Sequence, residues 1–280
     1  MGGLILALTS ALAYGTSDFM GGLASRRTDV PRVLVVSYPV SAVLMLLAAI
    51  PAGGSPTLVD LLWGAAAGLV MAFAAWSFYL ALAVGPISIV SPITALLSAA
   101  VPLTIGLALG ERIEPVAMGG VVAALLAVVL VSLSPHADTH ASHPFTRYVA
   151  ILTFASGIAW AGSYVFTGQI DEAAGIWPLL AARAAASVAV LAVAASRSHL
   201  APPRGRALVQ SVVIGVLDAI AHLTMMLALQ SGLLSLSSVV ISLFPAITVL
   251  LAVTVLREKL SMIQLAGLAL GAVGVVLIGL

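Results

Sequence analysis

LALAVGPISIVS at residues 80–91 returns in altered form as LALQSGLLSLSS at residues 227–238. At the same spacing of 147 residues the match runs without a gap to the C-terminus, and sixteen of 55 paired positions are identical. A shared preference for apolar residues raises that number, but it does not explain why Glu111 falls on Glu258. The chain therefore contains an internal repeat, and the repeat decides how the rest of the sequence is interpreted.

The composition is that of a membrane protein. Of 280 residues, 62% are hydrophobic and 8% are charged, with a mean hydropathy of +1.21, whereas a soluble domain has roughly a quarter of its residues charged. The strand alternation of a transmembrane barrel is missing, so the apolar segments are predicted to be helices of about 20 residues. The ten predicted helices lie near residues 2–23, 33–50, 58–83, 86–109, 115–134, 147–168, 174–195, 207–229, 232–256 and 262–280.

Each repeat contains five of these helices. Because five is odd, the second copy enters the membrane from the opposite side, which is the arrangement that lets many secondary transporters expose one central site alternately to either side. We therefore expect an all-α membrane protein with a first repeat at 1–134, a linker at 135–146 and a second repeat at 147–280. The linker includes HADTHASH at 136–143, whose polar character favours a flexible connection over a metal site.

Basic residues are distributed unevenly between the loops. The loops that follow odd-numbered helices hold nine of them, whereas the loops on the other side hold only Arg112. Lys and Arg resist translocation, so the basic side is predicted to be cytoplasmic and both termini external; a miscounted helix is the alternative. The nine residues are Arg26, Arg27, Arg32, Arg147, Arg197, Arg204, Arg206, Arg257 and Lys259.

Several segments resemble a known family. FPAITVLLAVTVLREKLSMIQLAGLALGAVGVVL at 244–277 resembles the second part of an EamA repeat of the drug/metabolite transporter superfamily: a helix with Pro near its start, a turn with Glu, and a helix with several Gly. GLALGERIEPVAMGGVVAALLAVVL at 106–130 echoes it, and YLALAVGPISIVSPI at 79–93 and AYGTSDFMGGLASRR at 13–27 are also similar to the family.

The resemblance implies a secondary carrier in the bacterial plasma (inner) membrane. Such a protein moves a small metabolite, amino acid or drug-like compound by alternating access, and we expect export. The central cavity would be lined mainly by the first, third, fourth, sixth, eighth and ninth helices. Family membership does not name a substrate. Many relatives have cytoplasmic termini, and the distribution of basic residues departs from that pattern here.

Three ionisable residues lie deep in predicted helices: Asp218 and His222, one turn apart in the eighth, and Arg183 in the seventh. A charge at that depth costs a few kcal/mol or more unless it is paired or hydrated. Two interpretations stay open, a structural Asp218–Arg183 pair and a site for substrate or protons, in which protonation of Asp218 would release Arg183 for a substrate carboxylate. Under the repeat, Met71 stands opposite Asp218, so the charge belongs to one half alone.

Other candidates are less specific. Asp18, near the predicted cytoplasmic end of the first helix, would cap that end or guard the inner mouth. Pro92, Pro102 and Pro245 remove backbone hydrogen bonds and are candidate hinges. Aromatic residues on the helices expected at the cavity are candidate substrate contacts, although such residues also anchor membrane interfaces. They are Tyr14, Trp76, Tyr79, Trp160 and Tyr164.

Some functions are disfavoured. The sequence has no cysteine, no Walker motif, no HExxH and no GxSxG, so we expect neither an enzyme nor a bound cofactor or metal. The expected partners are a small-molecule substrate, the lipid bilayer and protons, without nucleic acid, and the protein is a monomer or a homodimer. The alternative function is a non-transporting membrane assembly subunit or sensor.

Overall fold

The computed structural model describes all residues except 1, 26–27, 86, 133–144, 197–199 and 258–260. The histidine-containing segment 136–143 and most of the predicted linker lie outside the described residues. The helices are α1 (Gly2–Ser25), α2 (Val30–Ala52), α3 (Leu58–Val84), α4 (Ile87–Ala108), α5 (Pro115–Ser132), α6 (Arg147–Thr167), the short 3-10 helix η1 (Glu172–Ala174), α7 (Trp177–Ser196), α8 (Arg206–Ser231), α9 (Leu234–Ile241), α10 (Phe244–Leu256) and α11 (Met262–Gly279).

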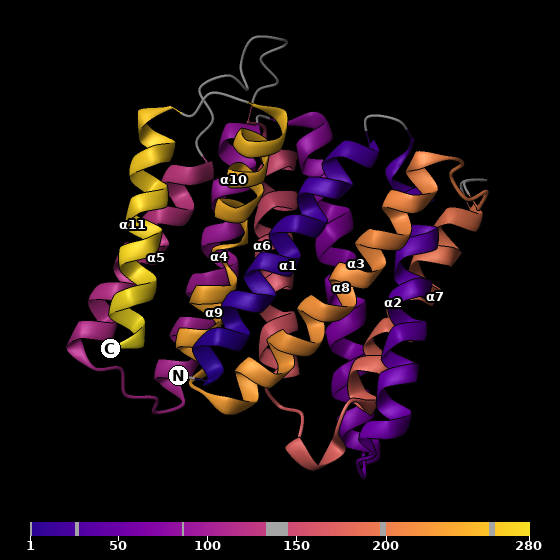
Figure 1. Ribbon diagram of the computed structural model, residues 1–280, viewed down its shortest axis with the longest axis horizontal. Helices are drawn as coiled ribbons and strands as arrows, with labels where there is room; N and C mark the ends of the chain where they lie inside the picture. Colours follow the sequence, from indigo (N-terminus) through magenta and orange to yellow (C-terminus); the bar gives the residue numbers. More distant parts are fainter. Residues whose placement is uncertain (1, 26–27, 86, 133–144, 197–199, 258–260) are drawn as a thin grey trace.

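The helices stand side by side as an all-α bundle of ten membrane-length rods, counted over the described residues, in which α9 and α10 together form the ninth (Figure 1). Eight described segments are long and apolar enough to cross a membrane, and α1 and α4, with 24 and 22 residues, complete the set. Both chain termini lie at one end of the bundle, here called the terminal end (Figure 1). The fold therefore has the architecture predicted from the repeat.

Two differences between the predicted and the observed helices have a clear cause in the sequence. The ninth is interrupted at Ser242 and Leu243, because Pro245 in the first turn of α10 has no N–H and its ring conflicts with the preceding turn. The seventh starts at Trp177, three residues later than predicted. Gly175 ends η1 with φ of 61°, and Pro178 then occupies the first turn of α7, a position that suits proline.

The two repeats pack through equivalent contacts. Helix α1 packs along α8 as α6 packs along α3, and α2 contacts α8 as α7 contacts α3. Gly68 of α3 and Gly215 of α8, which stand opposite each other in the repeat, lie directly against the backbone carbonyls of Ala182 and Ser37. A side chain at either glycine would overlap the facing helix, so these close approaches hold the two halves together.

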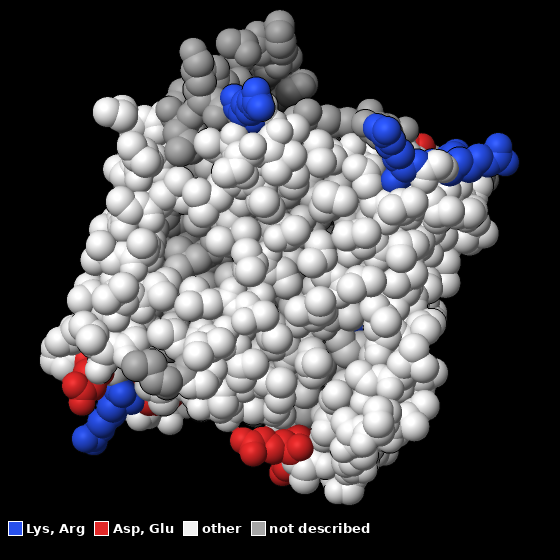
Figure 2. All heavy atoms as spheres, viewed as in Figure 1, with Lys and Arg blue, Asp and Glu red and all other residues white. Residues whose placement is uncertain are grey.

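Nearly all the charged residues visible on this face lie at the two ends of the bundle (Figure 2). Most Lys and Arg in this view lie at the end opposite the termini, here called the basic end, where α1 and α10 finish and α2, α6 and α8 begin (Figure 2). Arg112 lies beside acidic residues at the terminal end, in the turn between α4 and α5. The charge asymmetry between alternate loops is therefore also an asymmetry in space.

At the terminal end the two halves are joined by hydrogen bonds. The Glu111 carboxylate, after α4, accepts the backbone N–H groups of Leu234 and Ser235 at 2.8 and 3.0 Å, where α9 begins. Asp60 caps α3 through Thr57 and also accepts the N–H of Asp171 at 3.1 Å. These carboxylates bind N–H groups that have no partner inside a helix, which is the usual way to stabilise a helix start.

Candidate functional site

Arg183 of α7 is the central residue of the site and is 1% exposed. It lies six residues into the helix, about 9 Å from its start at 1.5 Å per residue. Its Nη1 is 3.1 Å from Oδ2 of Asp218, and its Nη2 contacts the imidazole of His222, both on α8. The guanidinium also stacks over the ring of Tyr38 of α2, at 5.3 Å from the ring centre.

His222 joins Arg183 to two further helices. The hydroxyl of Tyr14 on α1 is 2.9 Å from Nδ1 and 3.1 Å from Nε2, and the sulfur of Met71 on α3 is 3.0 Å from Nε2. The same sulfur is 3.5 Å from Nη2 of Arg183. Nη2 contacts both ring nitrogens, and because a guanidinium only donates hydrogen bonds, at least one of them has to be unprotonated, which corresponds to a neutral His222.

The Arg183–Asp218 pair is geometrically incomplete. In the described part of the chain, Nε of Arg183 has no hydrogen-bond partner, and neither Nη1 nor Oδ2 of Asp218 makes a hydrogen bond despite their short separation. A guanidinium that serves only to neutralise a carboxylate usually forms two parallel hydrogen bonds with it. The exposures differ as well, since the Asp218 side chain is 17% exposed and that of Arg183 is 1% exposed. Arg183 therefore retains unused donors, and Asp218 is the more accessible of the two side chains.

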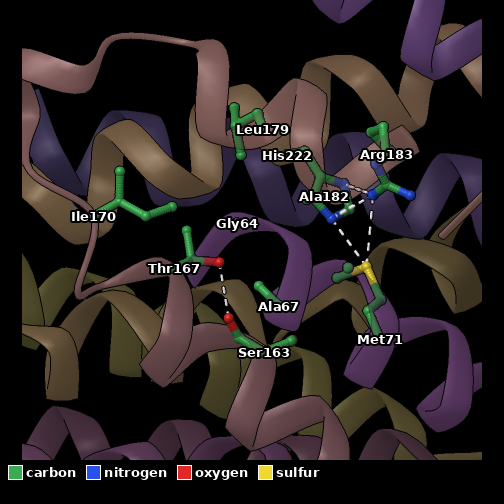
Figure 3. A pocket seen from close by; sticks show the side chains of 11 residues that line it. Gly64, Ala67, Met71, Ser163, Thr167, Ile170, Leu179, Ala182, Arg183 and His222 are labelled. Carbon is green, nitrogen blue, oxygen red and sulfur yellow. Dashed lines mark hydrogen bonds between the residues drawn. The ribbon is translucent and has the colours of Figure 1, made fainter. Parts of the chain in front are cut away.

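A small cavity adjoins this cluster on the side of α3 and α6 (Figure 3). Its free volume is about 10 Å³, about enough for one water molecule. Gly64 and Gly68 of α3 and the hydroxyl residues Ser163 and Thr167 of α6 line it together with Arg183 and His222. Both hydroxyls donate to backbone carbonyls of their own helix, at 2.7 and 2.8 Å, so their oxygens can still accept a hydrogen bond.

The structure brings some of the predicted aromatic residues to the site and not others. Tyr14 contacts His222, and Tyr164 is 1% exposed in the same core cluster as Tyr14. Trp160 is half-buried, and the side chain of Tyr79 lies outside the described part. Trp76 is 45% exposed and lies beside Phe73 on the outer stripe of α3, which is the exposed side of this helix. It therefore does not face the cluster, in contrast to the cavity position expected from the sequence.

Asp18 and the prolines occupy different environments. Asp18 is exposed and lies on α1 one turn beyond Tyr14, toward the basic end. Pro245 follows the interruption between α9 and α10, whereas α4 continues as a helix through the buried Pro102. The side chain of Pro92 lies outside the described part. Of Pro102 and Pro245, it is Pro245 that adjoins a break in its helix.

Tyr38 and Met71 are site residues that sequence reasoning did not select. Both are uncharged residues within apolar helices, and such residues are usually packing residues. A signal existed for Met71, because it stands opposite Asp218 in the repeat, whereas we find none for Tyr38. Within the described residues, no three His, Asp or Glu side chains gather in a way that could hold a metal ion.

Comparison with known proteins agrees with this architecture. The family model of the EamA-like transporter family matches residues 1–133 and again residues 147–280. The chain belongs to the EamA-like transporter family. A solved structure described only as the crystal structure of a protein superposes on this EamA transporter with a TM-score of 0.76 and 16% identity, over 98% of this chain and 95% of that chain. At that identity the likeness shows the fold alone. A search among curated proteins finds no match.

Membership makes the chain a multi-pass membrane protein of the drug/metabolite transporter type. The two family matches correspond to the two halves of the sequence, and the helices of one half pack mainly against those of the other. The cluster around Arg183 lies where these halves meet, since Tyr14, Tyr38 and Met71 come from the first EamA match and Arg183 and His222 from the second.

Proposed function

We propose that the protein is a secondary carrier that moves a small organic solute across the bacterial plasma membrane by alternating access around Arg183, Asp218 and His222. The observation that carries the proposal is a buried, incompletely paired arginine inside a bundle of two five-helix repeats. Charges at such depth are costly and mark substrate or ion pathways in membrane proteins. Repeats of opposite orientation permit the two halves to rock about that point.

Packing supports a state closed at the terminal end and looser at the basic end. Seven of the eight residues of α9, at the terminal end, are buried, whereas none of α10, Phe244–Leu256, is buried. Asp18 lies about 40° around α1 from the inward-facing Tyr14, at 3.6 residues per turn, and yet it is exposed. The Asp18 side chain therefore faces an accessible space inside the basic half of the bundle, which is the position expected of a residue at the inner mouth.

The basic end is assigned to the cytoplasm, because Lys and Arg are retained on that side. Both termini are then external. In this assignment the structure is accessible from the cytoplasm and closed to the outside, which is the state in which an exporter takes up its solute. We therefore propose export as the direction in the cell.

Asp218 is proposed as the residue that couples transport to protons. It is the more exposed member of the ion pair, and neutral His222 is 3.6 Å away through Nδ1, with Tyr14 behind it. A proton on Asp218 would weaken the attraction to Arg183 and change how α8 is held against α7. Proton binding and helix packing are in this way linked at one contact.

The test is transport in proteoliposomes by the wild-type protein and the Asp218→Asn variant across external pH. The expected result is pH-dependent transport by the wild type and pH-independent exchange by the variant. Unaltered pH dependence in Asp218→Asn would remove Asp218 from the coupling step. Substitution Pro245→Ala tests the rocking separately, and unchanged transport kinetics would count against a hinge there.

A non-transporting assembly subunit or sensor is the competing function. It predicts that no solute changes the accessibility of the bundle interior. Because the chain has no cysteine, Asp18→Cys provides a single label site at the proposed inner mouth. A labelling rate from the basic side that falls when solute is trapped supports a carrier, and a rate that no transported solute alters supports the competing function.

A further inference from the structure

We infer that the transported solute is a small organic anion with one carboxylate, that Arg183 binds it in place of Asp218, and that one proton travels with it. This inference rests on the proposed function, because it names the substrate class of the same site. It goes further in specifying the net charge that crosses the membrane, which is zero.

Arg183 has the unused hydrogen-bonding capacity that such a solute requires. A guanidinium has five N–H donors in a planar fork that matches a carboxylate. In the described part of the chain, Nε has no hydrogen-bond partner and Nη1 has only the ion contact with Asp218. Nη2 lies against His222 and the Met71 sulfur, both weak partners for a cation compared with a carboxylate. A buried group that is 99% covered and yet under-bonded is a site prepared for an anion.

The charges around Arg183 determine how many protons must accompany the anion. The described groups that face it are Asp218 and neutral His222 from α8, Tyr14 from α1, Tyr38 from α2 and Met71 from α3. Among them Asp218 is the one ionised partner, so the empty site is neutral. Asp18, one turn from Tyr14, is the next carboxylate along α1.

A carboxylate that joined Arg183 while Asp218 stayed ionised would leave the buried site with one uncompensated negative charge, which is strongly unfavourable. If Asp218 first takes a proton from water, the site remains neutral when the carboxylate binds. After the halves rock, the anion leaves, the proton returns from Asp218 to water on the other side, and Asp218 pairs with Arg183 again. One anion and one proton move together, with no bond broken other than the O–H of Asp218, so export in the cell is driven by the concentration gradient of the anion.

Other solute classes fit this charge pattern less well. A neutral solute would leave the Arg183–Asp218 pair intact and could accept hydrogen bonds from few of the Arg183 N–H groups. A cation would need Asp218 and leave Arg183 buried without an anion, and a dianion would leave a net negative charge. The difference in exposure also determines the order of proton and anion binding. The Asp218 side chain is 17% exposed and that of Arg183 is 1% exposed, so Asp218 is the more accessible to a proton from water. Protonation therefore precedes anion binding.

The experiment measures radiolabelled pyruvate and L-lactate in proteoliposomes, with lactamide as the neutral isostere and L-alanine as the zwitterion. Protein-free liposomes correct for diffusion of the undissociated acids. We expect both carboxylates to exchange, with the net rate rising about tenfold for each unit of pH decrease while Asp218 is mainly ionised. A potassium–valinomycin potential should leave the net rate unchanged, because no net charge moves.

Two variants separate the roles of the pair. Arg183→Gln should lower carboxylate exchange on the order of 100-fold, since hydrogen bonds to a charged group are lost. Asp218→Asn should still exchange carboxylates but lose both the pH dependence and proton-driven accumulation. The double variant Arg183→Gln/Asp218→Asn buries no charge and shows by size-exclusion chromatography whether the bundle folds without the pair. Glu114→Gln, in the exposed turn before α5, is the control for the purification.

Several outcomes would overturn the inference while leaving a carrier in place. They are lactamide or alanine exchanged as fast as lactate, a net rate that follows the membrane potential, and carboxylate exchange by Arg183→Gln equal to the wild type. Failure of the wild type to exchange any solute class, with a correctly folded protein, would overturn the proposed function and the inference with it. Carboxylate exchange that is selective, electroneutral and dependent on Arg183 supports both.

Discussion

Helices α3 and α8 occupy equivalent places in the two repeats, and they differ at one decisive turn. Both use a glycine, Gly68 and Gly215, to lie against the backbone of a helix from the other half. Three residues further on, α3 has Met71 and α8 has Asp218. These two side chains meet at the same guanidinium, with Met71 sulfur 3.5 Å from Nη2 and Asp218 3.1 Å from Nη1 of Arg183.

The difference separates what the repeat must preserve from what it can vary. Close helix contacts have to be similar in both halves if the halves are to exchange roles during transport. The charge has to be single, because a carboxylate from each repeat would place two anions at one arginine. Symmetry is thus a property of the backbone packing, and the chemistry of the site depends on breaking it.

The largest expected effect comes from making the two helices alike. Asp218→Met copies Met71 into α8 and leaves Arg183 buried without an anion, which should lower the free energy of unfolding by about 3–5 kcal/mol. Thermal unfolding of the purified protein in detergent measures it. The control is Asp218→Met combined with Arg183→Met, which removes both charges and should recover most of the loss. Equal stability of the single and double variants would mean that burying Arg183 without an anion carries no cost.

Breaking the symmetric part should cost less. Gly68→Ala and Gly215→Ala each push a methyl group into a facing carbonyl, and overpacking of this kind costs about 1–3 kcal/mol. Gly119→Ala in α5, where a Cβ would meet nothing within 4 Å, is the matched control and should be neutral or slightly stabilising. If all three variants melt at the same temperature, the close approaches are not needed for stability.

Glu111 tests whether a carboxylate outside the site has a structural role. Glu111→Ala removes the acceptor of two N–H groups at the start of α9, and we expect a loss of about 1–2 kcal/mol, as for other helix caps. Glu114→Ala, three residues along the same turn and exposed, should change the unfolding temperature little. A similar loss in both variants would point to the net charge of the turn instead of the capping contact.

Depth and repetition were predictable from the sequence, and orientation around a helix was not. Residue number along a helix gives depth directly, so Arg183, Asp218 and His222 could be selected, and the match at a spacing of 147 predicted two equivalent halves. The partners Tyr38 and Met71 come from other helices, and their contacts arise only when the halves pack. A helix beginning at residue 174, as predicted, would place Arg183 about 14 Å from its start, whereas the observed start at Trp177 places it about 9 Å in.

The smallest effect concerns a residue for which depth alone was misleading. Trp76 lies near the middle of its predicted helix, as Met71 does, but five residues turn the helix by about 500°, which leaves the two side chains about 140° apart. Met71 is 3% exposed against Arg183 and Trp76 is 45% exposed on the outer stripe with Phe73. Trp76→Phe should therefore alter the free energy of unfolding by less than about 0.5 kcal/mol and leave solute exchange in proteoliposomes near the wild-type rate. Tyr14→Phe, which removes the hydroxyl beside His222, is the inward-facing counterpart and should slow exchange. A larger loss of exchange from Trp76→Phe than from Tyr14→Phe would place the solute path along the outer side of α3 and away from Arg183.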